Sequence, residues 1–314
     1  MKKILFTCVI LILIIYSFFF PEITVDAARN GIQIWFHQIL PALLPFTILS
    51  AVLVKSDFLK SFKGNANLIA VILTMICGFI FGFPVGAKLS SDFYKQNLLS
   101  KKQASVLSIT TNNFSPMYVC GFAMSLLFAS KEYNICTYVL LYLIPLIIVT
   151  IYLLLHVPNR SLQSMSNRKE PFHKKPTSSF HLDMQVMDAG IISGFEALIK
   201  ICGYIVMFSI IAEIATTTIS NLVNEPPMLV TFLLGNLEIT NGINLLSECN
   251  ISESLKYIVA IQTLSFGGFS GLAQTSSILA NSGLSIHKYI IGKAALSLLL
   301  TLLSVIYVFF IRLL

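Results

Sequence analysis

Charged residues are scarce in this sequence. Only 11% of its 314 residues are Asp, Glu, Lys or Arg, and 56% are hydrophobic, whereas an ordinary soluble domain has about 25% charged residues. The mean hydropathy is +0.82. These values exclude a soluble globular protein, and they predict an integral membrane protein that has the lipid bilayer as a partner.

Acidic residues are the rarer of the two charged classes, so the formal net charge is +7. Such a balance can indicate nucleic-acid binding. Here, however, the lysines and arginines lie in short loops between apolar runs, where basic residues set the orientation of a protein in the membrane. We therefore expect no nucleic-acid partner.

Patterns for metal binding and catalysis are also missing. The six cysteines form no C-x-x-C pair, so they predict neither a zinc site nor a disulfide framework. No H-E-x-x-H or G-x-S-x-G motif occurs, and the run Phe266-Gly-Gly-Phe-Ser-Gly271 lacks the Gly-Lys-Ser/Thr ending of a phosphate loop. We expect no enzyme, no metal and no cofactor.

Four segments follow from the pattern of apolar runs and basic loops. Residues 1–26 contain Lys2, Lys3 and an apolar run, which is typical either of a signal peptide or of a retained anchor helix, and we favour the anchor with a cytoplasmic N-terminus. Residues 27–156 and 186–314 form two halves. Residues 157–185 are rich in basic residues and proline, which predicts a cytoplasmic linker.

Each half contains an apolar run that stops too early to cross a bilayer. The first breaks at Gly82-Phe-Pro-Val-Gly86 and continues to Lys88, and the second breaks at Gly235-Asn-Leu-Glu-Ile-Thr-Asn-Gly242. An apolar run, a break and a more polar return are typical of a re-entrant hairpin, whose broken backbone must line a cavity because unpaired N–H and C=O groups are costly in hydrocarbon.

Each half also contains a hydrophobic segment that polar or small residues interrupt. The interruptions are Thr111-Asn-Asn-Phe-Ser-Pro116 and Ser265-Phe-Gly-Gly-Phe-Ser-Gly-Leu-Ala-Gln274. The interval from Gly86 to Ser115 is 29 residues, as is the interval from Gly242 to Gly271. Equal spacing and equal order indicate an internal repeat of a hairpin followed by a broken transmembrane helix.

The charges that flank the two hairpins differ in sign. Lysines flank the first hairpin, whereas Glu225, Glu248 and Glu253 flank the second. The first hairpin is therefore predicted to open to the cytoplasm and the second to the outside. This predicts an all-α polytopic membrane protein of two inverted repeats, which is the architecture of secondary transporters.

The residues at the breaks are the candidate site. Lys88 either snorkels to the headgroups or holds an anion, and Glu238 either pairs with Lys88 or binds a coupling ion or the substrate. The polar groups at the breaks either join helices or bind the substrate. The predicted substrate-binding residues are Lys88, Asn112, Asn113, Ser115, Glu238, Thr240, Asn241, Ser270 and Gln274. The predicted backbone of the hairpins and breaks comprises Gly82, Pro84, Gly86, Pro116, Gly242, Gly267, Gly268 and Gly271.

Five motifs in order resemble one known family. They are Gly31-Ile-Gln-Ile-Trp35 with Leu40-Pro-Ala-Leu-Leu-Pro-Phe46, Gly82-Phe-Pro-Val-Gly-Ala-Lys88, Thr111-Asn-Asn-Phe-Ser-Pro116, Leu237-Glu-Ile-Thr-Asn-Gly242 and Phe266-Gly-Gly-Phe-Ser-Gly-Leu-Ala-Gln274. The chain thereby resembles the sporulation integral membrane proteins of the YlbJ type, in the group with nucleoside-recognition Gate domains. The resemblance implies an inverted-repeat plan and a role in moving dipicolinic acid across the outer forespore membrane.

The function expected from these observations is secondary transport of a small anionic metabolite, with dipicolinic acid as the first candidate and H⁺ or Na⁺ as a coupling ion. The expected location is the bacterial cell membrane or the outer forespore membrane. A nucleoside-type carrier and a non-transporting scaffold for spore assembly stay open as alternatives, and so does an oligomeric state.

Overall fold

The structure is a computed structural model, and it describes residues 2–56, 65–130, 132–156, 184–222, 228–280 and 282–311. Every regular element in these ranges is helical, which confirms the all-α class. The predicted linker lies outside the described residues up to residue 183, and its last two residues begin helix α12 (Met184–Leu222).

Several of these helices suit a membrane. Three are long and apolar enough to cross one within the described ranges, namely Glu132–Leu155, Met184–Ile219 and Ile286–Phe310. A fourth span exists if the bent pair Ile10–Phe19 and Pro21–His37 is counted as one. This supports a polytopic membrane protein.

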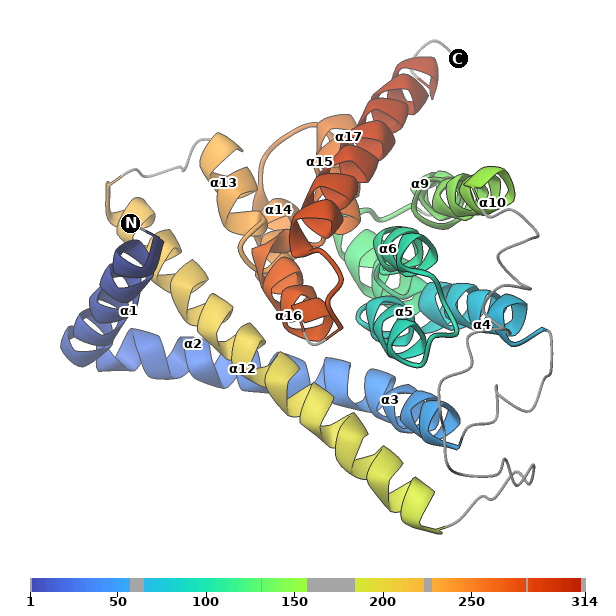
Figure 1. The fold of residues 1–314 in the computed structure, drawn as a ribbon. Coiled ribbons are helices and arrows are strands. Elements are labelled where there is room, and N and C mark those ends of the chain that lie inside the picture. The colour runs from blue at the N-terminus through green and yellow to red at the C-terminus, as the bar shows by residue number, and fades with distance from the viewer. Residues whose placement is uncertain are drawn as a thin grey trace.

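The first segment differs in detail from the prediction. Helix α1 (Lys2–Phe19) ends before residue 26, and the chain then bends by 112°. Pro21 opens α2 (Pro21–Ile34), where a proline fits because the first N–H of a helix has no partner within it. A π-helical turn, η1 (Trp35–Ile39), joins α2 to α3 (Leu40–Lys55), so these elements form one long rod (Figure 1).

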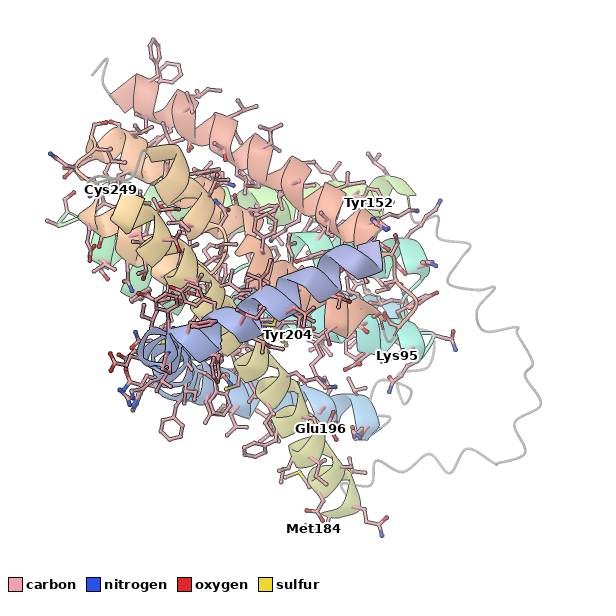
Figure 2. The ribbon with its side chains drawn as sticks, turned by 90° about the vertical axis from the view of Figure 1, so that its left-hand side faces the viewer. Lys95, Tyr152, Met184, Glu196, Tyr204 and Cys249 are labelled. Carbon is pink, nitrogen blue, oxygen red and sulfur yellow. The ribbon has the colours of Figure 1, made fainter. Side chains whose placement is uncertain are left out.

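Helix α12 crosses this rod and packs against both α2 and α3 (Figure 1). Figure 2 follows α12 from Met184 past Glu196 and Tyr204. The approach is close because glycines lie at the contact: a Cβ on Gly194 would meet the side chain of Ile48 at 2.8 Å. Small residues let helix backbones approach in this way in membrane proteins.

The first half continues with the predicted hairpin and broken helix. Helices α4 (Ala66–Phe81) and α5 (Val85–Lys95) pack together on either side of a break at residues 82–84. Helix α6 (Lys101–Thr110) ends at a second break, residues 111–115, and the helix resumes as α7 (Pro116–Tyr118), η3 (Val119–Ala123) and α8 (Met124–Leu127). The half ends with α9 (Glu132–Tyr138), η4 (Val139–Leu143) and α10 (Ile144–His156).

The second half has the same order of breaks. Helices α13 (Met228–Gly235) and α14 (Ile239–Glu248) flank a break at residues 236–238. Helices α15 (Glu253–Phe266) and α16 (Gly268–Ala280) meet at Gly267, and α17 (Ile286–Ile311) follows. In Figure 1, α4 and α13 lie on opposite sides of the molecule. The inverted relation of the halves to a membrane stays a prediction.

The two halves pack into one another. Helix α16 of the second half contacts α5 of the first, α17 contacts α6, and α14 contacts α8. One buried apolar cluster therefore joins Phe93 of the first half to Leu272 of the second, and another joins Val119 to Ile243. This interlocking brings the breaks of both halves to the middle of the molecule.

Candidate functional site

A cavity of about 860 Å³ lies where the four breaks meet. Each break contributes lining residues: Phe83 from the first hairpin, Phe114 and Ser115 from the first broken helix, Glu238 from the second hairpin and Gly267 from the second broken helix. Residues of the α2–α3 rod and of α12 close the cavity on other sides. The cavity is therefore built from both halves and from the helices that cross them.

Backbone contacts hold the first hairpin against the first broken helix. The Phe83 N–H donates to the carbonyl oxygen of Asn113 at 2.6 Å. Gly82 has φ +73° and a Cβ there would collide with the Ser115 nitrogen, so both the conformation and the space require glycine. A Cβ on Gly86 would likewise meet Thr111.

The second half has an equivalent pair of contacts. The N–H groups of Phe269 and Ser270 donate to the carbonyls of Asn236 and Leu237 at 2.7 and 3.0 Å. Gly267 ends α15 in the left-handed conformation, with φ +90°. The groups freed by the breaks are thus partly satisfied by the neighbouring break, as helix interruptions at membrane depth require.

The N-cap residues of two helices line the cavity. Ser115 is the N-cap of α7 and accepts from the N–H of Tyr118 at 3.3 Å, and Glu238 is the N-cap of α14 and accepts from the N–H of Asn241 at 2.8 Å. Helix α16 begins beside Gly267. Unpaired N–H groups and the helix dipole make such ends partially positive.

Polar side chains of the second half also face the cavity. Ser270 accepts from the Gln274 amide at 3.0 Å, while Gln274 Oε1 has no hydrogen-bond partner although the residue is only 5% exposed. The hydroxyl of Thr240 shares a hydrogen bond of 3.2 Å with that of Tyr118 and so links the halves. A buried, unpaired amide group needs a partner, and a ligand in the cavity can supply one.

The rest of the lining is mainly aromatic and aliphatic. Seven rings line the cavity, and no lysine or arginine does among the described residues; the rings are those of His37, Phe46, Phe81, Phe83, Phe114, Tyr118 and Phe122. Flat aromatic faces suit a ligand that has a planar ring. An apolar lining with a few convergent polar groups is the usual character of a small-molecule site.

No family model matches the chain, and no solved structure matches it. Among curated proteins, the sporulation integral membrane protein YlbJ of Bacillus subtilis (strain 168) is 24% identical in an alignment 309 positions long, which covers 87% of this chain and 74% of that protein. This chain is related to YlbJ. The predicted resemblance is thereby confirmed at modest identity, and it supports a sporulation-related integral membrane protein.

Five of the nine predicted substrate-binding residues of this YlbJ relative line the cavity, and two of the predicted glycines lie beside them. They are Ser115, Glu238, Thr240, Ser270 and Gln274, with Gly267 and Gly271. The other predicted backbone residues build the breaks behind them. Pro84 is the N-cap of α5, Pro116 is the first residue of α7, Gly242 packs on Gly235, and Gly268 packs on Ile239.

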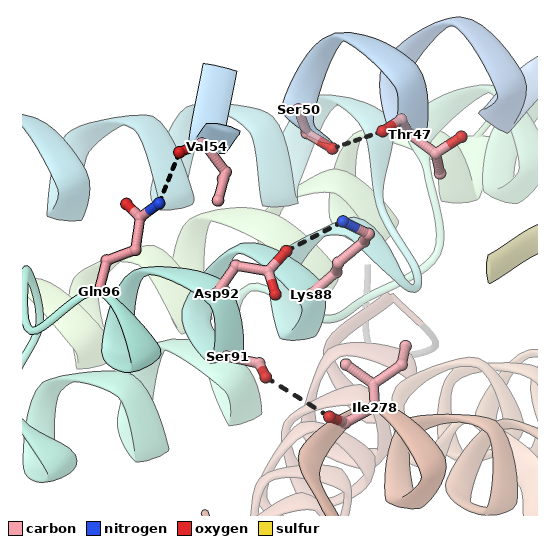
Figure 3. A network of polar contacts seen from close by, with 8 residues as sticks. All are labelled: Thr47, Ser50, Val54, Lys88, Ser91, Asp92, Gln96 and Ile278. Carbon is pink, nitrogen blue, oxygen red and sulfur yellow. Dashed lines mark hydrogen bonds and ion pairs between the residues drawn. The ribbon is translucent and has the colours of Figure 1, made fainter. Parts of the chain in front are cut away.

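Four predicted residues do not line the cavity. Asn112 and Asn113 are buried behind it, and Asn241 contributes its backbone N–H to the α14 cap. The Lys88 Nζ is 2.9 Å from Asp92 Oδ2, one turn along α5 (Figure 3). The idea that Lys88 pairs with Glu238 is therefore wrong: an i,i+4 partner on its own helix satisfies the ammonium.

Sequence reasoning missed the cation that does contact a break. Lys293 of α17 is 1% exposed, and its Nζ donates to the carbonyl of Asn112 at 2.9 Å and to Asn113 Oδ1 at 2.7 Å. The available signal was Lys293 itself, a lysine two turns inside an apolar helix of 26 residues, whereas Lys288 lies in the first turn of that helix. An ionisable group in such a position is a functional candidate by default.

Proposed function

We propose that this protein is a secondary transporter for a small, planar organic acid, with dipicolinic acid in sporulation as the first candidate. The observation that carries the proposal is the cavity formed where four helix breaks converge. Paired discontinuous helices around a central cavity are how secondary transporters build a substrate site. The relationship to a sporulation protein supports the biological setting.

The cavity offers a rationale for holding a ring that bears carboxylates. The rings of Phe83 and Phe114 lie at two of the breaks, with centroids 5.8 Å apart, and can contact the faces of a planar ligand. A carboxylate can then accept hydrogen bonds from the hydroxyl groups of Ser115 and Ser270, which line the cavity near the starts of α7 and α16. In this arrangement Lys88 is not needed as a direct ligand.

Glu238 is the natural site for a coupling proton. The residue is 6% exposed, lines the cavity and has no basic partner within ion-pair distance in the described part of the chain. An anionic substrate would be repelled by an ionised carboxylate in the same cavity. Binding a proton at Glu238 together with the anion removes this repulsion, so proton and substrate are expected to move together.

The test is flux into proteoliposomes that contain the purified full chain. We expect saturable uptake of labelled dipicolinate that a proton gradient drives. Glu238→Gln keeps an oxygen that can cap α14 but cannot take up a proton, so it should abolish acceleration by the gradient. Glu248→Gln, an exposed position at the end of the same helix, is the matched control and should transport normally.

The same experiment separates transport from a scaffolding role. A scaffold would give no saturable flux for any ligand, and spores that carry Glu238→Gln would then mature normally as long as the protein is present. Saturable flux that is equal in the Glu238→Gln variant and the native protein would instead remove the proton-coupling role while leaving transport intact.

One observation favours a second candidate, a nucleoside-type carrier. The described cavity lining carries a carboxyl group, an unpaired amide oxygen and the imidazole of His37 but no lysine or arginine, and this set suits a neutral ligand with N–H and O–H donors. Competition distinguishes the two. Uridine should not displace bound dipicolinate if the acid is the substrate, whereas binding of uridine without binding of dipicolinate would favour the nucleoside carrier.

A further inference from the structure

Lys293 occupies a site that has the ligands of a cation site. Its ammonium group contacts two oxygen atoms, the backbone carbonyl of Asn112 at 2.9 Å and the side-chain oxygen of Asn113 at 2.7 Å. Both lie in the break that follows α6, at the C-terminal end of that half-helix. Within the described residues, neither of the two ion pairs includes Lys293.

The chemistry of this position matches that of an ion site. Carbonyl and amide oxygens are the ligands that hard cations such as Na⁺ take from proteins, and the C-terminal end of a half-helix carries partial negative charge. Carriers with broken helices use such unwound carbonyls and half-helix C-termini to hold a coupling cation. Here a covalently attached ammonium group lies among the oxygens.

The surroundings fix this position. The Asn112 amide donates to Thr275 Oγ1 at 3.1 Å and to the Tyr289 hydroxyl at 2.9 Å, while its oxygen accepts from the Ala87 N–H at 3.4 Å. A Cβ built on Gly267, at the break of the other half, would lie 3.9 Å from Lys293 Cε. The lysine therefore lies between the two broken helices and contacts the one in the first half.

We propose that Lys293 is a resident cation that takes the place of a coupling sodium ion at the first broken helix, so that the protein works without sodium. This inference rests on the proposed transport function, because it concerns which ion drives that transport. It leaves the proton at Glu238 as the coupling ion.

The first test needs no substrate. The melting temperature of the purified full chain is measured in NaCl and in choline chloride at equal ionic strength. We expect the two values to agree for the native protein. For Lys293→Ala we expect a lower melting temperature, which Na⁺ or methylammonium, but not choline, raises by about 3 °C or more because they refill the oxygen site.

Two further variants make the result decisive. Lys293→Gln keeps hydrogen-bond donors without the charge and should also melt below the native protein, whereas Lys288→Ala, at an exposed position on the same helix, should not. Stabilisation of the native protein by Na⁺ over choline would overturn the proposal. So would a Lys293→Gln protein as stable as the native one, or a Lys293→Ala protein that neither small cation stabilises.

Flux distinguishes failure of this inference from failure of the proposed function. We expect uptake of dipicolinate by the native protein to be the same in sodium and in choline. Uptake that requires sodium would overturn the resident-cation proposal but leave transport in place. Absence of uptake in both salts would overturn the proposed function, and the melting experiment would still decide whether Lys293 fills a cation site.

Discussion

At the scale of single residues, Lys88 lies at a predicted break, as a substrate-binding residue would, but its ion-pair partner is a residue of its own helix. The side chains of Lys88 and Asp92 are 11% and 22% exposed, and they face each other on α5 (Figure 3). Removing one member of such a shielded pair costs more stability than removing one member of a surface pair, because the remaining charge is left unpaired in a poorly hydrated place.

We therefore expect Lys88→Ala to lower the free energy of unfolding by about 2 kcal/mol, as measured by thermal unfolding in detergent. The double variant Lys88→Met/Asp92→Leu should recover most of that loss and should transport, because no charge is left unpaired. Lys95→Ala, at the exposed end of α5, is the control. A double variant that is stable but inactive would instead give Lys88 the substrate-binding role predicted from the sequence.

Unlike the ammonium group of Lys88, the side-chain oxygen of Gln274 has no partner in the folded protein. Its Oε1 atom is unpaired in the cavity, so the folded protein gains nothing from that acceptor. Gln274→Leu removes this unsatisfied acceptor but also the 3.0 Å hydrogen bond that the Gln274 amide donates to Ser270, so the two effects oppose each other and the melting temperature should change little. It should raise the KM for the substrate roughly tenfold, which corresponds to about 1.4 kcal/mol.

The control for Gln274→Leu is the same substitution at a glutamine whose hydrogen bonds stabilise the fold. Gln103 completes the capping box of α6 and bonds Asn67 at 3.0 Å, away from the cavity. Gln103→Leu should lower stability and leave KM unchanged. The Gln274 role would be refuted if its Leu variant lost stability without any change in KM.

At the scale of elements, the breaks depend on glycine. The chain can leave α4 only through Gly82, where φ is positive and the first broken helix lies against the Cα. By contrast, Gly203 lies within α12, and a Cβ added there would meet nothing within 4 Å. Substitution at Gly82 therefore tests a conformational requirement for glycine, whereas substitution at Gly203 tests only the helix propensity of glycine.

Gly82→Ala is expected to lower the free energy of unfolding by about 2 kcal/mol or more, since strain and a steric clash add. It should also reduce transport, because relief of the clash would displace Ser115, which lines the cavity. Gly203→Ala should be neutral or stabilise by up to about 1 kcal/mol. Equal melting temperatures for the two variants would contradict the role given to Gly82.

The positions of these breaks were predictable because glycine and proline mark them locally, and Gly82, Pro116 and Gly267 each sit where a helix starts or stops. The contacts of the individual side chains could not all be predicted in this way. The partner of Lys88 is one turn away, whereas that of Lys293 is in the other half of the chain. The i,i+4 spacing of Lys88 and Asp92 is visible in the sequence and could have indicated their ion pair. Sequence periodicity carries no information on a contact between the two halves, so the contact of Lys293 was missed.

At the scale of the whole molecule, the structure consists of the α2–α3 rod, the crossing helix α12 and two halves that each contain a hairpin and a broken helix. The α2–α3 rod packs closely on α12, and α5 packs closely on α6, whereas the hairpin helices make far fewer contacts with the rod and with α12. Elements with few such contacts are the ones that can move at low cost. Alternating access would then come from the hairpins shifting against the rod and α12.

Alternating access of this kind needs the two hairpins to open on opposite sides of the membrane, and this can be measured directly. Single cysteines are introduced at Lys95, where α5 ends, and at Asn250, just beyond α14, both exposed, in a cysteine-free background. The lysine-rich flank of the first hairpin predicts that Lys95→Cys reacts with an impermeant maleimide only in inside-out vesicles. Asn250→Cys should react only in right-side-out vesicles. Labelling of both positions from one side would show that the halves are parallel, and the hairpins would then have no means of exposing the cavity to each side in turn.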